Sequence, residues 1–507
     1  MCVLIAGVAV GAFAMYLSPE VRVGKTLKLD TAFSATPRNV TYFMNGNSGG
    51  SGPWGTIDAT GLYTAPAVVP ATPHLKIQAI NDAGKVLGEV TLTIVAAPGP
   101  PPPEGTPVPA TMFGMHVHGM PVEYPTVTIG NMGKESAAQW GNIEHVAPRG
   151  AGCPGTVNCT HTYDWSVLDD YVNTAAAHGV QFQWTMDSGP PWATNSVGCN
   201  PGVWPQCTGP IVDLVDFDVF INALVTRYGA KIQTYELNNE ADYSGTPQQM
   251  AVQFEHVVVG VLAVKPDAKF AAGMDFPVNQ AGNTFHQVWA AWTAMPGNHA
   301  RVDYAALHGY GNADALMLLG QCHTGTPSWQ GRSVNGGQVD CVKQELAKMG
   351  LSATTPIWDT EGSWGSAGNG SLTIDQKEAY VATYYLIAWS LGVSRQEWYA
   401  WDNQGFGTLC AGNAPCVPNA AATAYAQTYA WMVGNVMTKR CASTGTVWTC
   451  ELTRPDGTRT LAVWDVANAS AFAVPAGYTR YADLTGNVAA VMNGTITLGV
   501  KPVLLEP

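Results

Sequence analysis

Two glutamates stand where an apolar, strand-like run gives way to polar residues. Glu240 lies in YELNNEADY, residues 235–243, which begins as a run rich in β-branched and aromatic residues. Glu361 lies in IWDTEGSWG, residues 357–365, again after an apolar entry. Two opposed carboxylates are the minimal equipment for cleaving a glycosidic bond, because one must protonate the leaving oxygen while the other attacks or activates water. The two segments therefore predict a pair of catalytic carboxylates.

The first of these segments gathers side chains that are costly to bury. It holds three acids and two amides within seven positions, namely Glu236, Asn238, Asn239, Glu240 and Asp242. Their desolvation cost predicts that the strand opens into a wet, functional mouth, as at the carboxyl end of a barrel strand. The alternative is a polar strand end that runs into a surface loop. The similar context of Glu361 favours the mouth.

The elements that must position these acids follow a pattern of strand alternating with helix. Three further strand-like runs follow Glu240, and the last of them ends at Glu361. In an eight-stranded parallel barrel this order places the acids on strands four and seven, facing each other across the mouth. We therefore predict a (β/α)8 TIM barrel, with strands at residues 112–118, 126–130, 180–186, 232–238, 270–274, 304–308, 356–360 and 396–401.

Short segments on and after these strands resemble one group of known enzymes. The pair Asn239 and Glu240 after one strand, with Glu361 ending a strand three units later, resembles the retaining clan A glycoside hydrolases. The segments FGMHVHG, SGPPWA, HGY, TEGSWG and WYAWDN are most similar to bacterial glycoside hydrolase family 39. The resemblance covers about residue 112 to the C-terminus. It implies a retaining β-glycoside hydrolase acting on oligo- or polysaccharide, with Glu240 as acid/base and Glu361 as nucleophile.

The same resemblance implies which residues hold the sugar. Asn239 would bind the sugar 2-hydroxyl, the Tyr310 hydroxyl would donate to Glu361, and His308 would lie beside it. Trp401, at the end of strand eight, would form the floor of the subsite for the reacting sugar. Further candidates are hydroxyl-binding histidines and aromatic walls, because sugar C–H faces stack on rings: His116, His118, Trp192 and Trp364. The alternative for each of these side chains is a structural role.

Two positions depart from the family's pattern. An Arg is usual on or just after strand two, but here that region reads IGNMGKES, in which only Lys134 is basic. The residue two before the acid/base is commonly Trp, and here it is Asn238. Both departures leave the identity of the sugar open.

Two other functions compete with glycoside hydrolysis. His116 and His118 lie one strand period apart, and together with His308 and Asp402 they resemble the ligands of metal-dependent amidohydrolase barrels. Such a barrel also needs a Lys or His on strand four and a His on strand five, and YELNNEADY and FAAGMDF supply neither. The second alternative is a catalytically inactive carbohydrate-binding protein. We expect neither a metal nor a cofactor.

Composition limits the partners of the chain. Only 12% of its residues are charged, and its net charge of −13 offers no basic field for nucleic acid or an anionic membrane. The surface must be covered largely by uncharged polar residues and glycine. We expect a monomer without a membrane span that acts on neutral carbohydrate.

The order of patterns along the chain predicts several domains, as its length allows. An apolar start, with a possible cut after Ala14, is interpreted as the remnant of a signal peptide, or else as an apolar first strand. Short strands then predict a β-sandwich that resembles bacterial Ig-like modules, most clearly in GTIDATGLYTAP, and it would be a spacer, an anchor or a sugar-binding module. The predicted boundaries are 1–14 for the signal remnant, 15–96 for the Ig-like domain, 97–110 for a Pro-rich linker, 111–436 for the catalytic barrel and 437–507 for a small C-terminal β-sandwich.

Ten of the eleven cysteines form close neighbours along the chain, and Cys2 would leave with the signal peptide. An even set in an exported chain predicts disulfides, whereas a zinc site is disfavoured because no C-x-x-C pair occurs. This supports a secreted or cell-surface location. The predicted pairs are Cys153 with Cys159, Cys199 with Cys207, Cys322 with Cys341, Cys410 with Cys416, and Cys441 with Cys450.

Overall fold

The fold is taken from a computed structural model of the chain. It describes residues 20–22, 26–29, 40–48, 51–66, 70, 74–95, 105–133, 139–144, 146–147, 159–187, 189–194, 209–240, 245–274, 285–311, 338–352, 354–467 and 470–507. The chain divides into two compact units, Met1–Ala97 and Pro98–Pro507. The predicted signal remnant and most of the predicted linker lie outside the described residues.

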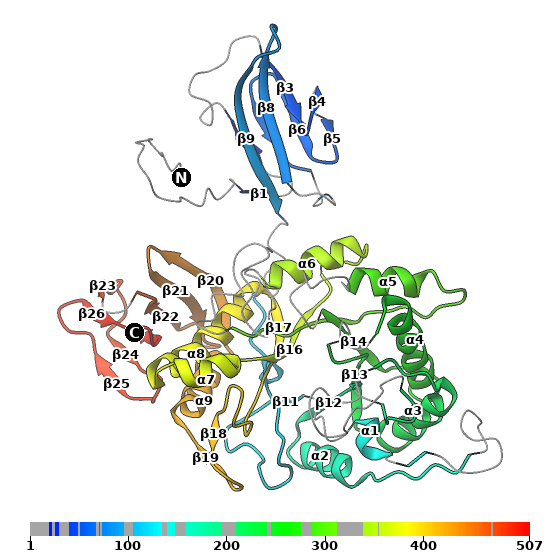
Figure 1. The fold of residues 1–507 in the computed structure, drawn as a ribbon. Helices are drawn as coiled ribbons and strands as arrows, with labels where there is room; N and C mark the ends of the chain where they lie inside the picture. Colours follow the sequence, from blue (N-terminus) through cyan, green and yellow to red (C-terminus); the bar gives the residue numbers. More distant parts are fainter. Residues whose placement is uncertain are drawn as a thin grey trace. The chain divides into compact units, whose positions relative to one another are not determined.

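The larger unit contains a closed barrel of eight strands (Figure 1). Every neighbouring pair is parallel, and the last strand pairs with the first. The predicted TIM barrel is confirmed. Its strands are β10 (Phe113–Met115), β11 (Asn131–Met132), β12 (Gln181–Thr185), β13 (Ile232–Glu236), β14 (Lys269–Met274), β15 (Tyr304–Leu307), β16 (Ile357–Gly362) and β17 (Val393–Trp398).

Helices follow the strands and cover the outside of the barrel (Figure 1). The two longest begin with capping boxes, built by Thr246 with Gln249 and by Thr373 with Gln376. The second of them ends at Gly392, whose φ of 93° suits glycine. The helices are α1 (Trp140–Ile143), α2 (Ser166–Ala177), α3 (Leu214–Tyr228), α4 (Pro247–Val264), α5 (Phe285–Thr293), α6 (Gln338–Lys348), α7 (Gly365–Ser371), α8 (Ile374–Leu391) and α9 (Ala420–Met432).

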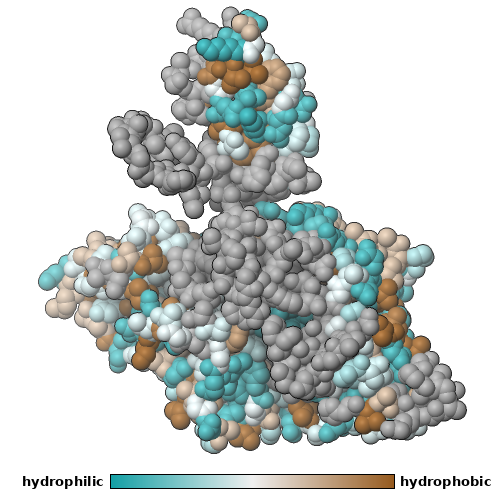
Figure 2. Space-filling model, viewed as in Figure 1, coloured by the Kyte–Doolittle hydropathy of each residue, from teal (hydrophilic) through white to brown (hydrophobic). Residues whose placement is uncertain are grey.

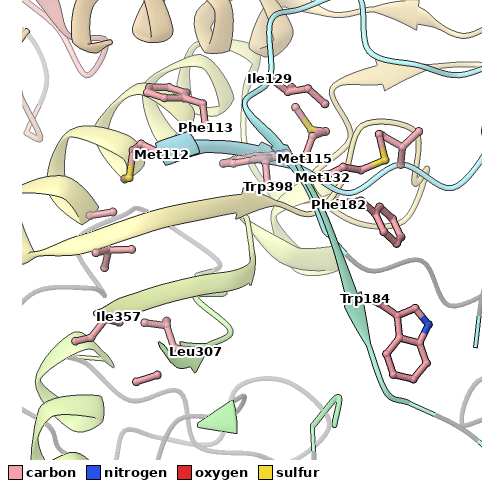
Figure 3. Close-up of a cluster of buried hydrophobic side chains, with 14 of the residues drawn as sticks. Met112, Phe113, Met115, Ile129, Met132, Phe182, Trp184, Leu307, Ile357 and Trp398 are labelled. Carbon is pink, nitrogen blue, oxygen red and sulfur yellow. The ribbon is translucent and has the colours of Figure 1, made fainter. Parts of the chain in front are cut away.

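The hydrophobic core lies between these strands and helices. Phe113 and Met115 of β10, Met132 of β11 and Trp398 of β17 are all buried (Figure 3). The ring of Phe113 stacks on Tyr385 of α8 at a centroid distance of 4.2 Å. Burial of this aromatic and aliphatic surface is the main term that holds the strands in place.

Two predicted strands begin at other residues in the structure. Strand two was predicted at residues 126–130, but the pairing begins only at Asn131, and β11 is two residues long. The residues before it instead approach the short 3₁₀ helix η1 (Ala110–Met112) so closely that a Cβ on Gly130 would clash with its backbone. Strand eight starts at Val393 rather than at residue 396. β-Branched composition alone does not decide strand position, because pairing and burial override it.

The smaller unit has two sheets around one buried core. Tyr63 and Ile57 from one sheet, and Leu75, Ile77 and Leu92 from the other, contribute to that core. One sheet has the order β1-β9-β8-β3-β4, with β1 (Glu20–Arg22), β3 (Val40–Met44), β4 (Asn47–Ser48), β8 (His74–Asn81) and β9 (Val86–Val95). The other has the order β2-β7-β6-β5, with β2 (Thr26–Lys28), β5 (Ser51–Gly52), β6 (Gly55–Ile57) and β7 (Leu62–Thr64).

The end of the chain forms a six-stranded antiparallel sheet in the larger unit. Leu452 and Trp464 join the core of the barrel, whereas Val463 and Leu505 pack with Ile496 from a separate pair of strands. The sheet comprises β20 (Val436–Thr444), β21 (Val447–Thr453), β22 (Arg459–Asp465), β24 (Arg480–Ala482), β25 (Val488–Ala490) and β27 (Val503–Glu506), and the pair is β23 (Ser470–Ala473) with β26 (Thr495–Leu498).

The coloured face of the larger unit is mixed in character. On the face shown in Figure 2, hydrophilic and hydrophobic side chains lie side by side over the coloured part of the larger unit. Among the described helices, none combines the length and the apolar character needed to cross a bilayer.

Candidate active site

Glu240 lies just beyond the end of β13, in a turn that its neighbours hold in place. Its φ of 46° is in the left-handed region, which is uncommon for a residue other than glycine and typical of functional sites. The side chain of Asn238 donates to the carbonyl of Asn239 at 2.7 Å and accepts from Gln253 of α4, also at 2.7 Å. Asn238 is thus a buried brace for the turn, which accounts for its departure from the Trp that the resemblance implies.

The polar residues of YELNNEADY, predicted to line a wet mouth, have different exposures in the structure. Glu240 and Asn239 are partly exposed, but Glu236 is 1% exposed, inside the barrel. Its carboxylate accepts hydrogen bonds from Thr185 at 2.7 Å and from Thr360 at 2.8 Å. Because Thr360 is on β16, Glu236 ties the two strands that lead to the candidate acids across the barrel interior. Asp242 lies outside the described residues.

Four side chains meet at the carboxyl ends of β13, β15 and β16. His308 contacts both glutamates: its Nδ1 is 3.1 Å from Oε1 of Glu240, and its Nε2 is 3.8 Å from Oε2 of Glu361. The hydroxyl of Tyr310 donates to Oε1 of Glu361 at 2.5 Å. One carboxylate or imidazole atom from each of Glu240, His308 and Glu361 lies within 4.8 Å of the other two. The structure therefore brings together the two acids and the HGY segment, as the sequence predicted.

The protonation of Tyr310 suits a donor. Burial, followed by the negative charge of Glu361, raises its pKa well above the ordinary value for tyrosine. The hydroxyl therefore stays protonated and stabilises the ionised form of Glu361.

The two histidines after β10 have different environments. His116 is 1% exposed, and its Nε2 donates to the carbonyl of Thr360 at 2.7 Å, so its predicted contact with substrate hydroxyls is corrected to an internal one. His118 is partly exposed and lies 3.2 Å from Asp402 and 3.1 Å from the hydroxyl of Tyr399. Burial would raise the pKa of Asp402, but the bonds from His118 and the Gly119 amide outweigh it and hold that pKa below its usual range.

Tyr399, which the sequence analysis missed, follows the end of β17 and lies beside three candidate site residues. Its ring lies 5.1 Å from that of His116, 5.2 Å from that of His118 and 6.3 Å from that of Tyr310, and it is partly exposed. The segment WYAWDN contains it, but three aromatic residues compete there, and only packing decides which one faces the mouth.

The predicted tryptophan platforms differ in exposure. Trp364 is fully buried, with its ring packed edge-on against Tyr380 and Trp398, so it has no open face for a sugar. Trp401 is 1% exposed, and its backbone pairs with the carbonyl of His116, which contradicts its predicted role as a floor. Trp192 is partly exposed beside the buried Trp140 and remains a candidate wall.

The histidines of the amidohydrolase alternative do not converge within the described part of the chain. The clusters that could offer three ligand atoms there are Glu240 with His308 and Glu361, and Glu123 with Cys410 and Cys416. The two cysteines of the second cluster are joined to each other, which removes their thiolates. The first cluster is the acid pair already described, and neither His116 nor His118 belongs to it.

The predicted pairings Cys410–Cys416 and Cys441–Cys450 are confirmed as disulfides. Cys159 and Cys341 are also disulfide-bonded. Four other cysteines of the predicted pairs lie outside the described residues, namely Cys153, Cys199, Cys207 and Cys322. Lys134 also lies outside them.

Fold and site together define a (β/α)8 barrel with an acid pair at the carboxyl ends of strands four and seven. Solved structures with the same fold are glycoside hydrolases. A family 39 glycoside hydrolase from the gut symbiont Bacteroides cellulosilyticus WH2 has a TM-score of 0.52 at 15% identity, covering 96% of this chain and 98% of that one.

Two further structures match the larger part of the chain. A family 39 β-xylosidase from Caulobacter crescentus has a TM-score of 0.53 at 13% identity, covering 80% of this chain and 98% of its own. A glucosidase from Croceicoccus marinus has a TM-score of 0.52 at 13% identity, covering 79% and 97%. At these identities the likeness establishes the shared fold. No family model and no curated protein matches the chain.

Proposed function

We propose that this protein is a retaining β-glycoside hydrolase that acts on oligo- or polysaccharide, with Glu240 as acid/base and Glu361 as nucleophile. Two observations carry the proposal: the hydroxyl of Tyr310 donates to Glu361 at 2.5 Å, and an oxygen of Glu361 lies within 4.8 Å of an oxygen of Glu240. Retaining enzymes need their two carboxyl groups about 5 to 5.5 Å apart, whereas inverting enzymes leave room for a water molecule. The short separation supports double displacement.

The contacts assign a role to each side chain in this reaction. An oxygen of Glu361 attacks the anomeric carbon, and Glu240 gives its proton to the leaving oxygen, so a glycosyl ester replaces the glycosidic bond. Glu240 then takes a proton from water, which attacks the anomeric carbon and releases Glu361. Tyr310 holds Glu361 in its ionised form until it attacks, and His308 fixes the relation between the two acids.

The substrate-binding surface includes residues around this pair. Asn239 precedes Glu240 and binds the sugar 2-hydroxyl in this proposal, an interaction that strengthens as positive charge develops on the sugar. Tyr399 takes the role that the sequence assigned to Trp401, because its ring is partly exposed beside Tyr310. His118 and Trp192 are further contacts in this proposal.

The organisation of the rest of the chain also belongs to the proposal. We place an Ig-like β-sandwich at residues 15–96 and a small C-terminal β-sandwich at 437–507, flanking the catalytic domain at 111–436. The disulfides support export, and the signal remnant at residues 1–14 is part of the same interpretation. The chain would act as a monomer.

The test is a screen of chromogenic β-glycosides and of plant and microbial polysaccharides with the wild-type protein and Glu361→Gln. The amide cannot form the glycosyl ester, so the variant should lose turnover by a factor of about 10⁴ or more. Glu378→Gln is a matched control, because Glu378 is buried on α8 and pairs with Lys501 away from the site. Wild-type rates in Glu361→Gln would overturn the assignment, and sugar binding without any turnover would favour the inactive carbohydrate-binding alternative.

A further inference from the structure

A third acid, Asp359, lies two residues before Glu361 on β16, and none of the steps above uses it. It is completely buried. Its Oδ1 accepts a hydrogen bond from the amide of Gly309 at 3.0 Å, and its Oδ2 lies 2.5 Å from the hydroxyl of Tyr384 on α8. The same tyrosine hydroxyl bonds to the carbonyl of Gly309. Asp359 and Tyr384 therefore bind the amide and the carbonyl of Gly309, which lies between His308 and Tyr310.

The number of protons in this cluster is informative. The carbonyl of Gly309 and an ionised carboxylate can only accept, and the hydroxyl of Tyr384 carries one proton. One proton cannot serve both close contacts well. If Asp359 carries a proton, it donates to the oxygen of Tyr384, which in turn donates to Gly309, so that each of these two close contacts contains one proton.

Two glycines leave the space that this arrangement occupies. A Cβ on Gly309 would clash with the Tyr384 hydroxyl and with Asp359, and a Cβ on Gly362 would clash with the same hydroxyl. These glycines flank the two residues whose side chains meet in the site, Tyr310 and Glu361. Asp359 and Tyr384 therefore pack directly against the backbone that carries Tyr310 and Glu361.

We propose that Asp359 works as an uncharged carboxylic acid that positions Tyr310 and Glu361, by holding Gly309 through Tyr384. This inference rests on the proposed function, because its consequence is the geometry of the nucleophile. Asp359 is a positioning residue and touches no substrate. When it ionises, Tyr384 turns its proton to the carboxylate and the carbonyl of Gly309 loses its donor.

The surroundings of Asp359 agree with this role. Burial raises its pKa to about 6, although hydrogen bonds from Tyr384 and the Gly309 amide act in the opposite direction. The groups that face it are His308 from the end of β15, Tyr384 from α8 and Gln396 from β17. Tyr385, the next residue of α8, feels its charge from farther away.

The test compares Asp359→Asn, Asp359→Ala and Tyr384→Phe in the full chain. Asparagine has the shape of the protonated acid and can donate to Tyr384, so Asp359→Asn should stay within about fivefold of wild-type kcat/KM near pH 5.5, whereas the other two lose roughly 10- to 100-fold. Tyr385→Phe is the control, because this neighbour is equally buried and its hydroxyl contacts Gly114 instead. If Asp359→Asn is as impaired as Asp359→Ala, the working form is the carboxylate and the proposal fails.

The pH profile separates positioning from a merely structural role. It is measured as kcat/KM on the 2,4-dinitrophenyl β-glycoside of the sugar found in the screen, since this leaving group needs no proton from Glu240. Wild-type kcat/KM should fall above about pH 6, whereas Asp359→Asn should show no such fall. Superimposable profiles would overturn the proposal.

A second measurement does not depend on turnover. The infrared difference spectrum between wild type and Asp359→Asn should show the carbonyl stretch of a protonated carboxyl group, which fades as pH rises through about 6. Absence of this band at pH 5 would contradict the inference even if every glycoside were cleaved. If the band is present and no glycoside is cleaved, the proposed function fails while the protonation of Asp359 stands.

Discussion

The hydroxyl of Tyr310 donates to Oε1 of Glu361 over 2.5 Å, from a side chain that is itself held beside Gly309 at the end of β15. This contact joins two strand ends that are 51 residues apart in the sequence. Glu361 thereby accepts from a tyrosine hydroxyl, whereas Glu240 is paired with the imidazole of His308 at 3.1 Å. The asymmetry of the two acids, and hence their different roles, begins with this bond.

Tyr310→Phe should lower kcat by roughly 10- to 100-fold, because a hydrogen bond to a charged group contributes about 1.5 to 3 kcal/mol. The pKa of Glu361 should rise once the donor is lost, so the acid limb of the kcat/KM profile should move to higher pH. Tyr228→Phe, whose hydroxyl bonds Asp169 on the outside of the barrel, serves as control. An unchanged acid limb would show that Tyr310 does not stabilise the ionised nucleophile.

Glu240→Ala should slow glycosides with poor leaving groups by about 10²- to 10⁴-fold, and activated aryl glycosides much less. Azide should partly restore turnover of the activated substrates, because it can attack the glycosyl ester without a general base. The measurement is kcat for a series of aryl glycosides with and without azide. A loss that is equal across all leaving groups, with no rescue, would show that Glu240 is not the acid/base.

Glu236→Ala should destabilise the barrel by about 3 kcal/mol or more, because at least three buried donors lose their acceptor. These donors are Thr185, Thr360 and Gln183. Activity should fall together with stability, since Glu236 ties the strands that carry the acid pair. Urea unfolding and kcat of Glu236→Ala and Glu236→Gln are compared, and the Gln variant should lose less, as it keeps one acceptor oxygen.

The elevated pKa of Asp359 predicts how stability depends on pH. Its folded value of about 6 lies above the ordinary 3.8, so the folded state retains a proton that the unfolded chain releases between these values. Stability should therefore decrease as pH rises from about 4 to 7, by roughly 3 kcal/mol. Asp359→Asn removes this dependence, and Tm measured across the window for both proteins provides the check. Parallel Tm curves would contradict it.

Loss of the disulfide Cys410–Cys416 should weaken activity before it unfolds the barrel. The bridge closes the hairpin β18 (Cys410–Ala411) to β19 (Val417–Pro418), and Cys410 bonds the carbonyl of Trp401 at 2.7 Å. A double substitution to Ser should cost about 2 kcal/mol and raise KM, because the segment after β17 carries Tyr399. An unchanged KM would show that the bridge has no role in shaping the site.

The local patterns of the sequence were enough to predict the barrel and its two acids. Strand alternates with helix along the chain, and each acid follows its own apolar run. A parallel barrel collects the carboxyl ends of its strands at one edge, so residues at strand ends meet without any further information. The resemblance of the HGY segment predicted that His308 and Tyr310 lie beside Glu361, and the structure places them there.

Local patterns failed where the outcome depended on packing. Three aromatic residues compete in WYAWDN, and only the surrounding side chains leave Tyr399 open while they cover Trp401. Trp364 is covered by Tyr380 and Trp398 in the same way. Sequence spacing cannot reveal this, because exposure is a property of neighbours from other elements.

Tertiary structure alone also decided the roles of the additional acids. In the sequence Glu236 and Asp359 resemble their neighbours Glu240 and Glu361, since all four stand at the ends of apolar runs. The fold turns Glu236 into the barrel interior toward Thr360 and closes Asp359 against Tyr384 on α8, while Glu240 and Glu361 stay at the mouth. Burial and hydrogen-bond partners set what a carboxyl group can do, and in a barrel those partners come from distant strands and helices.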